Sequence, residues 1–463
     1  MSSPQTPQDA ARAFWARPAG QRRLHDWQAA IDSGDFTSAQ ALEALVERAR
    51  SQAAVTATAY LEFDADKLTD RLARVDPTQP LAGVPISIKD LFDVQGELTR
   101  AASRVLGGNP PASHDAPAVQ RLRRAGALLT GRTNMSEFAF SGLGLNRHYG
   151  TPPNPFDDER ITGGSTSGGA ASVAFGLAAA TLGSDTGGSL RIPAAFCGLT
   201  GFKPSQASVP GEGAYPLAPS LDCVGPIAPS VACCASLWSI LAERPLPALD
   251  ATPRPLRLAI AEGGLMSELD DAVRDGFAEA VAVLEASGCH VERLPFAAVD
   301  AALAINQQGG LVVPEAAALH REQLARAEAD YDPLIAERLK GGRDISAADY
   351  LQRLWPRAGW QQRFEQEMAG FDAVLLPTVA TLPPRRAALE NDAAAFQRAN
   401  RLALRNTSVF NYLDAASISL PYLATGAELP IGLMLSRPQG DDDALLQHAC
   451  VVEAMLQGTD RSR

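Results

Sequence analysis

Two clusters of glycine and hydroxyl residues carry the side chains best suited to chemistry, GGSTSGG at 163–169 and DTGGSLR at 185–191. The second cluster predicts a strand, a glycine turn over 185–188 and a helix that begins near Ser189. Backbone N–H groups of such a turn, reinforced by a helix N-terminus, suit a developing oxyanion beside an exposed serine. Taken alone, a serine in this position is more often a helix N-cap.

The first cluster supplies three further hydroxyls. Ser165, Thr166 and Ser167 lie in a segment that is too glycine-rich for regular structure, and a small-residue helix is predicted to follow over 170–175. Because alanine and glycine pack closely, the two clusters can lie side by side. A phosphate-binding loop is the alternative, but the chain has no GxxxxGK[ST] pattern and no lysine follows these glycines.

A nucleophilic serine needs a base, and Lys89 is the candidate. None of the six histidines lies in the two clusters, and neither a GxSxG elbow nor an SxxK pair is present. Lys89 ends the apolar segment GVPISIKD, which predicts a buried strand. Burial disfavours the ammonium form, and a neutral lysine is a competent general base. The alternative is a structural ion pair between Lys89 and either Asp90 or Asp93.

Three segments together resemble the amidase signature family of serine hydrolases. They are GVPISIKD, GGSTSGGAASVA and GSDTGGSLRIPAAFCGLTGFKPS, in this order along the chain. The resemblance extends over about residues 37–457. It implies an α/β fold in which helices cover both faces of a large mixed β-sheet.

The resemblance also implies roles for individual residues. Ser189 corresponds to the nucleophile, Ser165 to the bridging serine, whose peptide bond is cis, and Lys89 to the base. The oxyanion hole is implied at four consecutive backbone N–H groups, those of Thr186, Gly187, Gly188 and Ser189.

Residues around this triad are expected to support it. Thr166 stands where the family usually has serine, and its hydroxyl is expected to preserve support of the triad. Asp185 and Arg191 flank the nucleophile and are expected to hold the turn by hydrogen bonds, with contact between Arg191 and an anionic substrate as the alternative. Met135 is expected to face the substrate pocket.

The walls of the pocket are expected to come from variable segments. The sequence points to residues 140–150, 210–220 and 305–360 for these walls, without assigning individual contacts.

The alternation of strands and helices predicts a single domain over residues 1–463. Within it, 9–80 are expected to form N-terminal helices and 81–240 the catalytic core. Residues 255–350 are expected to form a helical elaboration, and 351–457 the C-terminal part of the core.

Helical spacing near the start of the chain predicts one helix over 9–31 and another over 38–53. Thr37 or Ser38 is the expected N-cap of the second helix.

Composition limits the class of partner. The net charge of −12 and the pI near 5.1 argue against nucleic acid. No apolar run approaches a membrane span, and the N-terminus lacks the pattern of a signal peptide. The six cysteines form no CxxC pair and no metal-ligand spacing, so we expect reduced thiols in a cytoplasmic protein that needs no metal and no cofactor.

The function expected from these features is that of a stand-alone amidase acting on a small neutral amide through an acyl-enzyme, and a homodimer is left open. A second hypothesis is the ammonia-releasing A-type subunit of an aminoacyl-tRNA amidotransferase, which would need partner chains. Two departures weaken it, the segment KPSQASVPGEGAYP at 203–216 and Cys223 where that subunit typically has glutamine. A third hypothesis is a catalytically inactive scaffold.

Overall fold

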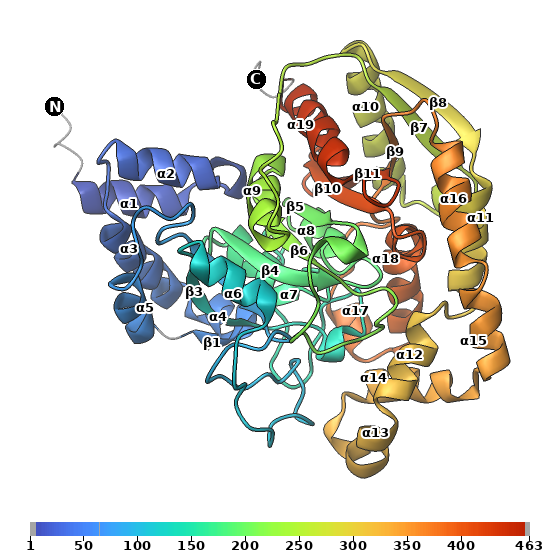
Figure 1. Ribbon diagram of the computed structural model, residues 1–463, viewed down its shortest axis with the longest axis horizontal. Helices are drawn as coiled ribbons and strands as arrows, with labels where there is room; N and C mark the ends of the chain where they lie inside the picture. Colours follow the sequence, from blue (N-terminus) through green and yellow to red (C-terminus); the bar gives the residue numbers. More distant parts are fainter. Residues whose placement is uncertain (1–5, 64, 459–463) are drawn as a thin grey trace.

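Within residues 6–63 and 65–458, which the computed structural model describes, eleven strands form one mixed sheet (Figure 1). In order across the sheet the strands are β1 (Tyr60–Phe63), β3 (Leu128–Thr133), β2 (Pro85–Lys89), β4 (Ala180–Asp185), β6 (Cys223–Ala228), β5 (Thr200–Lys203), β10 (Ala416–Tyr422), β11 (Ile431–Arg437), β9 (Ala373–Pro377), β7 (Arg257–Glu262) and β8 (His290–Pro295). The predicted fold class, an α/β fold with a large mixed sheet, is confirmed.

Parallel pairs lie toward both ends of the sheet, antiparallel pairs lie between them, and the edge strand β1 is antiparallel to β3. β2 is parallel to both β3 and β4, and β7 is parallel to both β8 and β9. Because Ile88 of β2 is level with Leu182 of β4, the next residue, Lys89, lies beside the end of β4. Parallel pairing therefore brings the lysine segment and the second glycine cluster to one edge of the sheet.

Helices cover both faces of the sheet, and β5 shows the alternation that this requires. A Cβ atom on Gly201 would meet the backbone of Leu190 and the side chain of Ala194, so Gly201 faces the helix that follows the glycine turn. The ring of the next residue, Phe202, packs against Trp238 of another helix. Since successive strand residues point to opposite faces, the two helices lie on opposite sides of the sheet.

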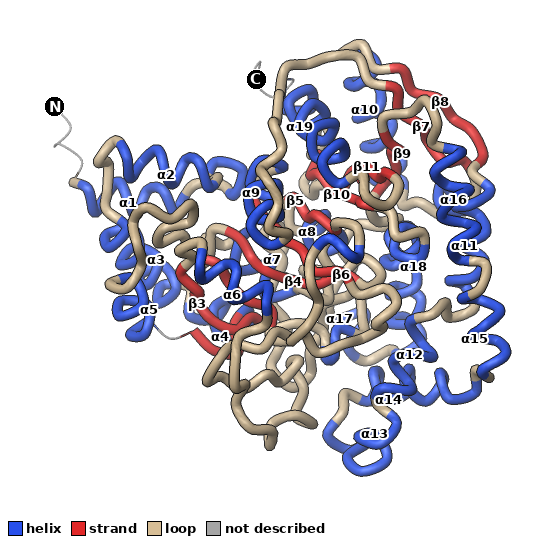
Figure 2. Tube along the Cα trace, viewed as in Figure 1, coloured by secondary structure: helices blue, strands red, loops and turns tan. Residues whose placement is uncertain are grey.

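The helices are, in chain order, α1 (Pro7–Ala16), α2 (Leu24–Asp32), α3 (Ser38–Ser51), α4 (Ala53–Ala59), α5 (Ala65–Leu72), α6 (Pro117–Arg124), α7 (Ser167–Ala174), α8 (Arg191–Phe196), α9 (Val231–Leu241), α10 (Asp271–Ala286), α11 (Ala297–Gln307), α12 (Val312–Leu319), α13 (Arg321–Ala327), α14 (Pro333–Gly341), α15 (Ala347–Leu354), α16 (Arg357–Glu367), α17 (Ala387–Glu390), α18 (Ala393–Tyr412) and α19 (Asp442–Gly458). Residues 242–256, which contain no helix or strand, cross from α9 to β7 (Figure 2). The region 255–350 contains α10–α14, and it also contributes β7 and β8 to the same sheet. No helix of the described residues is long and apolar enough to cross a membrane.

The N-terminal helices lie together at one end of the molecule (Figure 1). The single helix predicted over 9–31 is wrong, because α1 ends at Ala16 and α2 begins at Leu24. Pro18 lies in the break, where its missing N–H and its restriction of the preceding residue interrupt a helix. The prediction for α3 is confirmed, since the Thr37 side chain accepts the N–H of Gln40.

Helix α7 begins earlier than predicted, at Ser167 instead of residue 170, and therefore includes two glycines of the first cluster. A Cβ atom on Gly168 would lie 2.2 Å from the carbonyl oxygen of Ala59 and 2.6 Å from the backbone nitrogen of Asn134. The glycine is needed because three backbone segments approach one another there.

We expect Gly168→Ala to destabilise the fold by about 1–3 kcal/mol, because the neighbours that must move are backbone atoms. Urea denaturation of the purified protein measures this. Gly359→Ala in α16 is the matched control, since its Cβ would meet nothing within 4 Å. In an open helical position alanine is expected to stabilise by about 0.5–1 kcal/mol. Equal midpoints for Gly168→Ala and the parent would contradict the close approach.

Candidate active site

Lys89 is fully buried at the end of β2 and meets only neutral oxygen atoms. Its Nζ donates to Ser165 Oγ at 2.7 Å, to Ser184 Oγ at 2.9 Å and to the Ser184 carbonyl at 3.4 Å. The alternative ion pair with Asp90 or Asp93 is wrong, because Asp90 accepts from Arg132 at 3.0 Å and Asp93 accepts from the Thr99 hydroxyl at 2.7 Å. Burial lowers the pKa of Lys89 to about 7, although the charges of Asp185 and Asp222 act in the opposite direction.

Ser165 is held from both sides immediately before α7. The peptide bond between Gly164 and Ser165 is cis, as the resemblance implied. The N–H of Gly164 donates to the carbonyl of Gly142 at 2.9 Å, and the carbonyl of Ser165 accepts from the N–H of Ser136 at 3.1 Å. These backbone contacts direct the Ser165 hydroxyl toward Lys89.

Ser189 lies in the turn between β4 and α8 and forms part of a cavity wall. It is only 3% exposed, so the expectation of an exposed serine is wrong; α18 and neighbouring loops cover the turn. The N–H of Thr166 donates to the Ser189 carbonyl at 3.3 Å and so joins the two clusters. Among the described residues, no hydrogen bond joins the hydroxyls of Ser165 and Ser189 directly.

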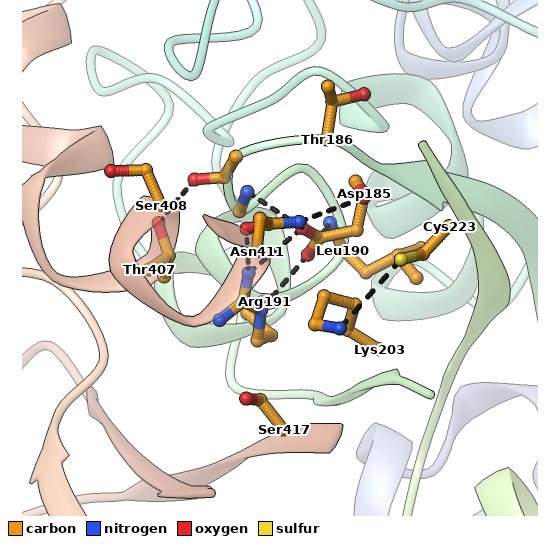
Figure 3. Close-up of polar contacts among 12 residues, drawn as sticks. Asp185, Thr186, Leu190, Arg191, Lys203, Cys223, Thr407, Ser408, Asn411 and Ser417 are labelled. Atoms are coloured by element: carbon orange, nitrogen blue, oxygen red, sulfur yellow. Dashed lines mark hydrogen bonds and ion pairs between the residues drawn. The ribbon is translucent and has the colours of Figure 1, made fainter. Parts of the chain in front are cut away.

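A buried carboxylate organises the turn around Ser189. Asp185 accepts from the backbone N–H groups of Gly188 at 2.8 Å and Leu190 at 3.1 Å. Arg191 donates to both carboxylate oxygens, at 3.0 and 2.9 Å, and the Asn411 amide donates to the same carboxylate at 2.9 Å (Figure 3). Burial alone would raise the pKa of Asp185, but Arg191 and the hydrogen bonds hold it well below its usual range.

The expected hydrogen bonds of Asp185 and Arg191 are therefore present. Arg191 is fully buried, and its guanidinium also donates to Asn411 at 2.7 Å. It is absent from the described lining of the cavity, which argues against the alternative contact with an anionic substrate.

Of the four N–H groups that were expected to form the oxyanion hole, one is already hydrogen-bonded to a described residue and three are not. The N–H of Gly188 is already engaged by Asp185, and Gly188 does not line the cavity. Thr186, Gly187 and Ser189 do line it, and their N–H groups donate to no described residue. The Thr186 hydroxyl donates to Asp222 at 2.6 Å, which anchors this end of the turn.

Two of the expected supporting residues behave differently from the predictions. The Thr166 hydroxyl is buried and makes no hydrogen bond within the described residues, so Thr166 contributes its backbone instead. Met135 is fully buried in the main hydrophobic core and does not line the cavity, so its expected position in the pocket is wrong. Its side chain supports the core beneath the site.

The cavity beside Ser189 has a volume of about 220 Å³. Each segment expected to form its walls contributes, through Phe140 and Ser141, Leu217, and residues between 306 and 338. Sequence reasoning missed the wall formed by α18, which supplies Gln397, Asn400, Arg401, Leu404, Arg405 and Ser408. The spacing of three and four residues places these side chains on one face of the helix, which was the only signal in the sequence.

Within the described residues, no group of three or more His, Cys, Asp or Glu side chains is arranged to hold a metal ion. The six cysteines are all free and buried. The polar groups beside the cavity are thus hydroxyls, amides, backbone N–H groups and cations.

We expect Asp185→Asn to cost about 3–5 kcal/mol of stability, because it leaves the Arg191 guanidinium buried without its counter-charge. Urea denaturation at neutral pH measures the loss. Because the pKa of Asp185 is lowered by folding, its contribution is complete at neutral pH and fades as the pH falls below about 4. The difference between the two proteins should therefore narrow in acid.

The control for this substitution is Asp271→Asn, which removes an exposed ion pair with Arg274. A surface pair of this kind contributes about 0–1 kcal/mol. Similar losses for the two substitutions would contradict the importance assigned to Asp185.

Comparisons with known proteins identify the family of this chain. The family model for Amidase matches residues 40–446. The chain is 31% identical to 2-amino-5-chloromuconic acid deaminase of Comamonas testosteroni, covering 86% of this chain and 88% of the relative. It is 32% identical to the A-type subunit of the glutamyl-tRNA(Gln) amidotransferase of Roseiflexus sp. (strain RS-1), covering 92% and 95%.

A solved structure described as an amidase superposes with a TM-score of 0.83 at 32% identity, covering 94% of this chain and 100% of that one. The extent of the family match, together with these similarities over most of the length, determines the family. The chain belongs to the amidase signature family and is an amidase, a hydrolase of carbon–nitrogen bonds.

Proposed function

We propose that this enzyme hydrolyses a carboxylic amide to an acid and ammonia or an amine through an acyl-enzyme on Ser189. The observation that carries the proposal is the 2.7 Å hydrogen bond between Lys89 Nζ and Ser165 Oγ at a fully buried lysine. With a pKa lowered to about 7, Lys89 is substantially neutral at physiological pH and can accept a proton.

In the proposed reaction, Lys89 takes the proton of Ser165 as Ser165 takes the proton of Ser189. The Ser189 oxygen attacks the amide carbonyl carbon, and the negative charge develops on the carbonyl oxygen. The N–H groups of Thr186, Gly187 and Ser189 stabilise that charge. The carbon–nitrogen bond then breaks, the relay returns a proton to the leaving nitrogen, and water releases the acid by the same route.

One contact of this relay must form with substrate present, because the hydroxyls of Ser165 and Ser189 are not directly hydrogen-bonded in the free chain. Catalytic hydrogen bonds are often long before the substrate binds and tighten in the complex. The Ser189 carbonyl already accepts the N–H of Thr166, the residue after Ser165, and this bond keeps the two segments together before substrate binds.

A second candidate function is that of an amidotransferase A-type subunit, which the similarity to the Roseiflexus protein supports. This function requires partner chains that receive the ammonia. Stoichiometric co-purification of such chains from the source cells would favour it. Turnover of free amides by the isolated chain favours the stand-alone enzyme, and labelling by a serine-reactive phosphonate excludes an inactive scaffold.

We expect Ser189→Ala to lower kcat for amide hydrolysis at least about a hundredfold, because no other described hydroxyl occupies this place in the turn. Ammonia or amine release from a panel of amides measures it, together with loss of phosphonate labelling. The melting temperature should change by only about 2–4 °C, since a single hydroxyl is removed. Retention of more than a few per cent of the activity would contradict the assignment of the nucleophile.

For Lys89 we expect kcat/KM to rise with pH and level off above about 7, because the base must be neutral before it accepts a proton. Lys89→Ala should lose most activity and this rising limb. Lys89→Arg should likewise lack both the activity and the rising limb, since arginine keeps its proton in this range. Near-parental turnover by Lys89→Arg would show that the lysine serves only as a structural cation.

A further inference from the structure

The cavity beside Ser189 is cationic, although the whole chain has a net charge of −12. Three arginines, Arg338, Arg401 and Arg405, belong to its lining, and no aspartate or glutamate does among the described residues. None of the three forms an ion pair with a described carboxylate. For the two that are partly buried, Arg338 and Arg405, a cation without a counter-charge is costly, and a bound anion would supply the opposite charge.

Arg338 of α14 is the most firmly held of these cations. Its guanidinium carbon lies 4.1 Å from the centre of the Phe140 ring, and its Nη1 donates to the Phe140 carbonyl at 2.8 Å. Burial lowers the pKa of Arg338 to about 10, and no nearby carboxylate opposes this shift. The group therefore stays charged at neutral pH, with N–H donors that no described residue accepts.

Helix α18 brings Arg401 to the same part of the wall. Its neighbour Asn400 accepts from the Ser141 hydroxyl at 3.2 Å and from the Gly142 N–H at 2.8 Å, which docks the helix on the segment that follows Phe140. Arg401 itself is exposed, and its side chain makes no hydrogen bond with a described residue. Arg338 and Arg401 thus border the same segment from two helices.

Arg405 lies one turn further along α18 and contributes mainly its charge. Its Nη2 donates to the Leu265 carbonyl at 2.9 Å and its Nε to Asn406 at 3.0 Å, whereas Nη1 is buried without a partner among the described residues. Glu268 acts on its charge without forming an ion pair. This fixed guanidinium makes the cavity more favourable for an anion.

Arg401 lies at a distance from the reacting centre. Ser408 of α18 faces the glycine turn, since its Cβ lies 3.7 Å from the position that a Cβ on Gly187 would take. At 1.5 Å per residue, Arg401 begins about 10 Å along the helix from Ser408. Apolar side chains complete the wall, namely Leu217, Leu303, Val312, Val313 and Leu404.

We propose that the amide substrate carries a carboxylate at the far end of an apolar spacer, and that Arg338 and Arg401 bind this carboxylate. The proposal rests on the proposed function, because it names the substrate class of the same site. It also replaces the neutral amide that was expected from the sequence. A guanidinium matches a carboxylate with two parallel N–H donors, which explains arginine in place of lysine.

The test compares amides that differ only in this terminal charge. Monoamides of adipic, pimelic and suberic acid are assayed against hexanamide, heptanamide and octanamide. We expect kcat/KM for the best anionic amide to exceed that of its neutral match at least about tenfold. Arg338→Gln and Arg401→Gln should each lower this ratio several-fold, and Arg338→Lys should retain part of it.

Arg398→Gln is the matched control, since Arg398 is exposed on α18 and does not line the cavity. It should keep the parental ratio. If Arg338→Gln does not fold, Arg401→Gln still tests the proposal, because this exposed side chain holds no described part of the fold together.

A binding measurement distinguishes a failure of the carboxylate site from a failure of the proposed acyl-enzyme. Calorimetry with the Ser189→Ala protein measures affinity for the same amides without turnover, and the anionic members should bind more tightly. Neutral amides that are bound and hydrolysed as well as the anionic ones, or an unchanged ratio in both glutamine variants, would overturn the carboxylate site. Turnover that survives Ser189→Ala would instead overturn the acyl-enzyme while the binding result still stands.

Discussion

The buried carboxylate of Asp185 holds together the part of the molecule on which the site depends. It ends β4, binds two N–H groups of the following turn, and pairs with Arg191 at the start of α8. Through Asn411 it also fixes α18 against the same turn. A single ionised group therefore positions Ser189, determines which N–H groups remain free, and sets where the cavity wall formed by α18 stands.

Lys89 is fully buried and Arg338 is partly buried, and neither has a carboxylate partner among the described residues. Their different chemistry gives opposite consequences. Lys89 is surrounded by neutral oxygens, and burial brings its pKa to about 7, so the low-dielectric setting favours the neutral base. Burial also lowers the pKa of Arg338, but only to about 10, so Arg338 keeps its proton at neutral pH. Burial thus favours a proton acceptor at Lys89, whereas Arg338 remains a permanent positive charge in the cavity wall.

Close packing of small residues joins the two glycine clusters. The glycines of α7 admit the backbone of neighbouring segments, and the hydrogen bond from Thr166 to Ser189 links the loop before α7 to the turn before α8. The hydroxyls therefore need not be exposed to be reactive. Ser189 lies beside α18 and is almost fully buried, and in such surroundings the N–H dipoles of the turn act more strongly on a developing charge than they would in water.

The sequence alone determined the α/β class and located the strand that ends at Lys89 and the two glycine clusters, because each rests on a local pattern. The apolar segment before Lys89 is a strand whatever its neighbours, and the glycine clusters identify the loops that follow. Only the tertiary structure decided what lies opposite these loops. The partner of Asp90, the burial of Met135, the engagement of the Gly188 N–H and the wall formed by α18 depend on segments far apart in the chain. These features depend on charges and hydrogen bonds between distant segments, and a local sequence pattern does not indicate which distant side chain will be the partner.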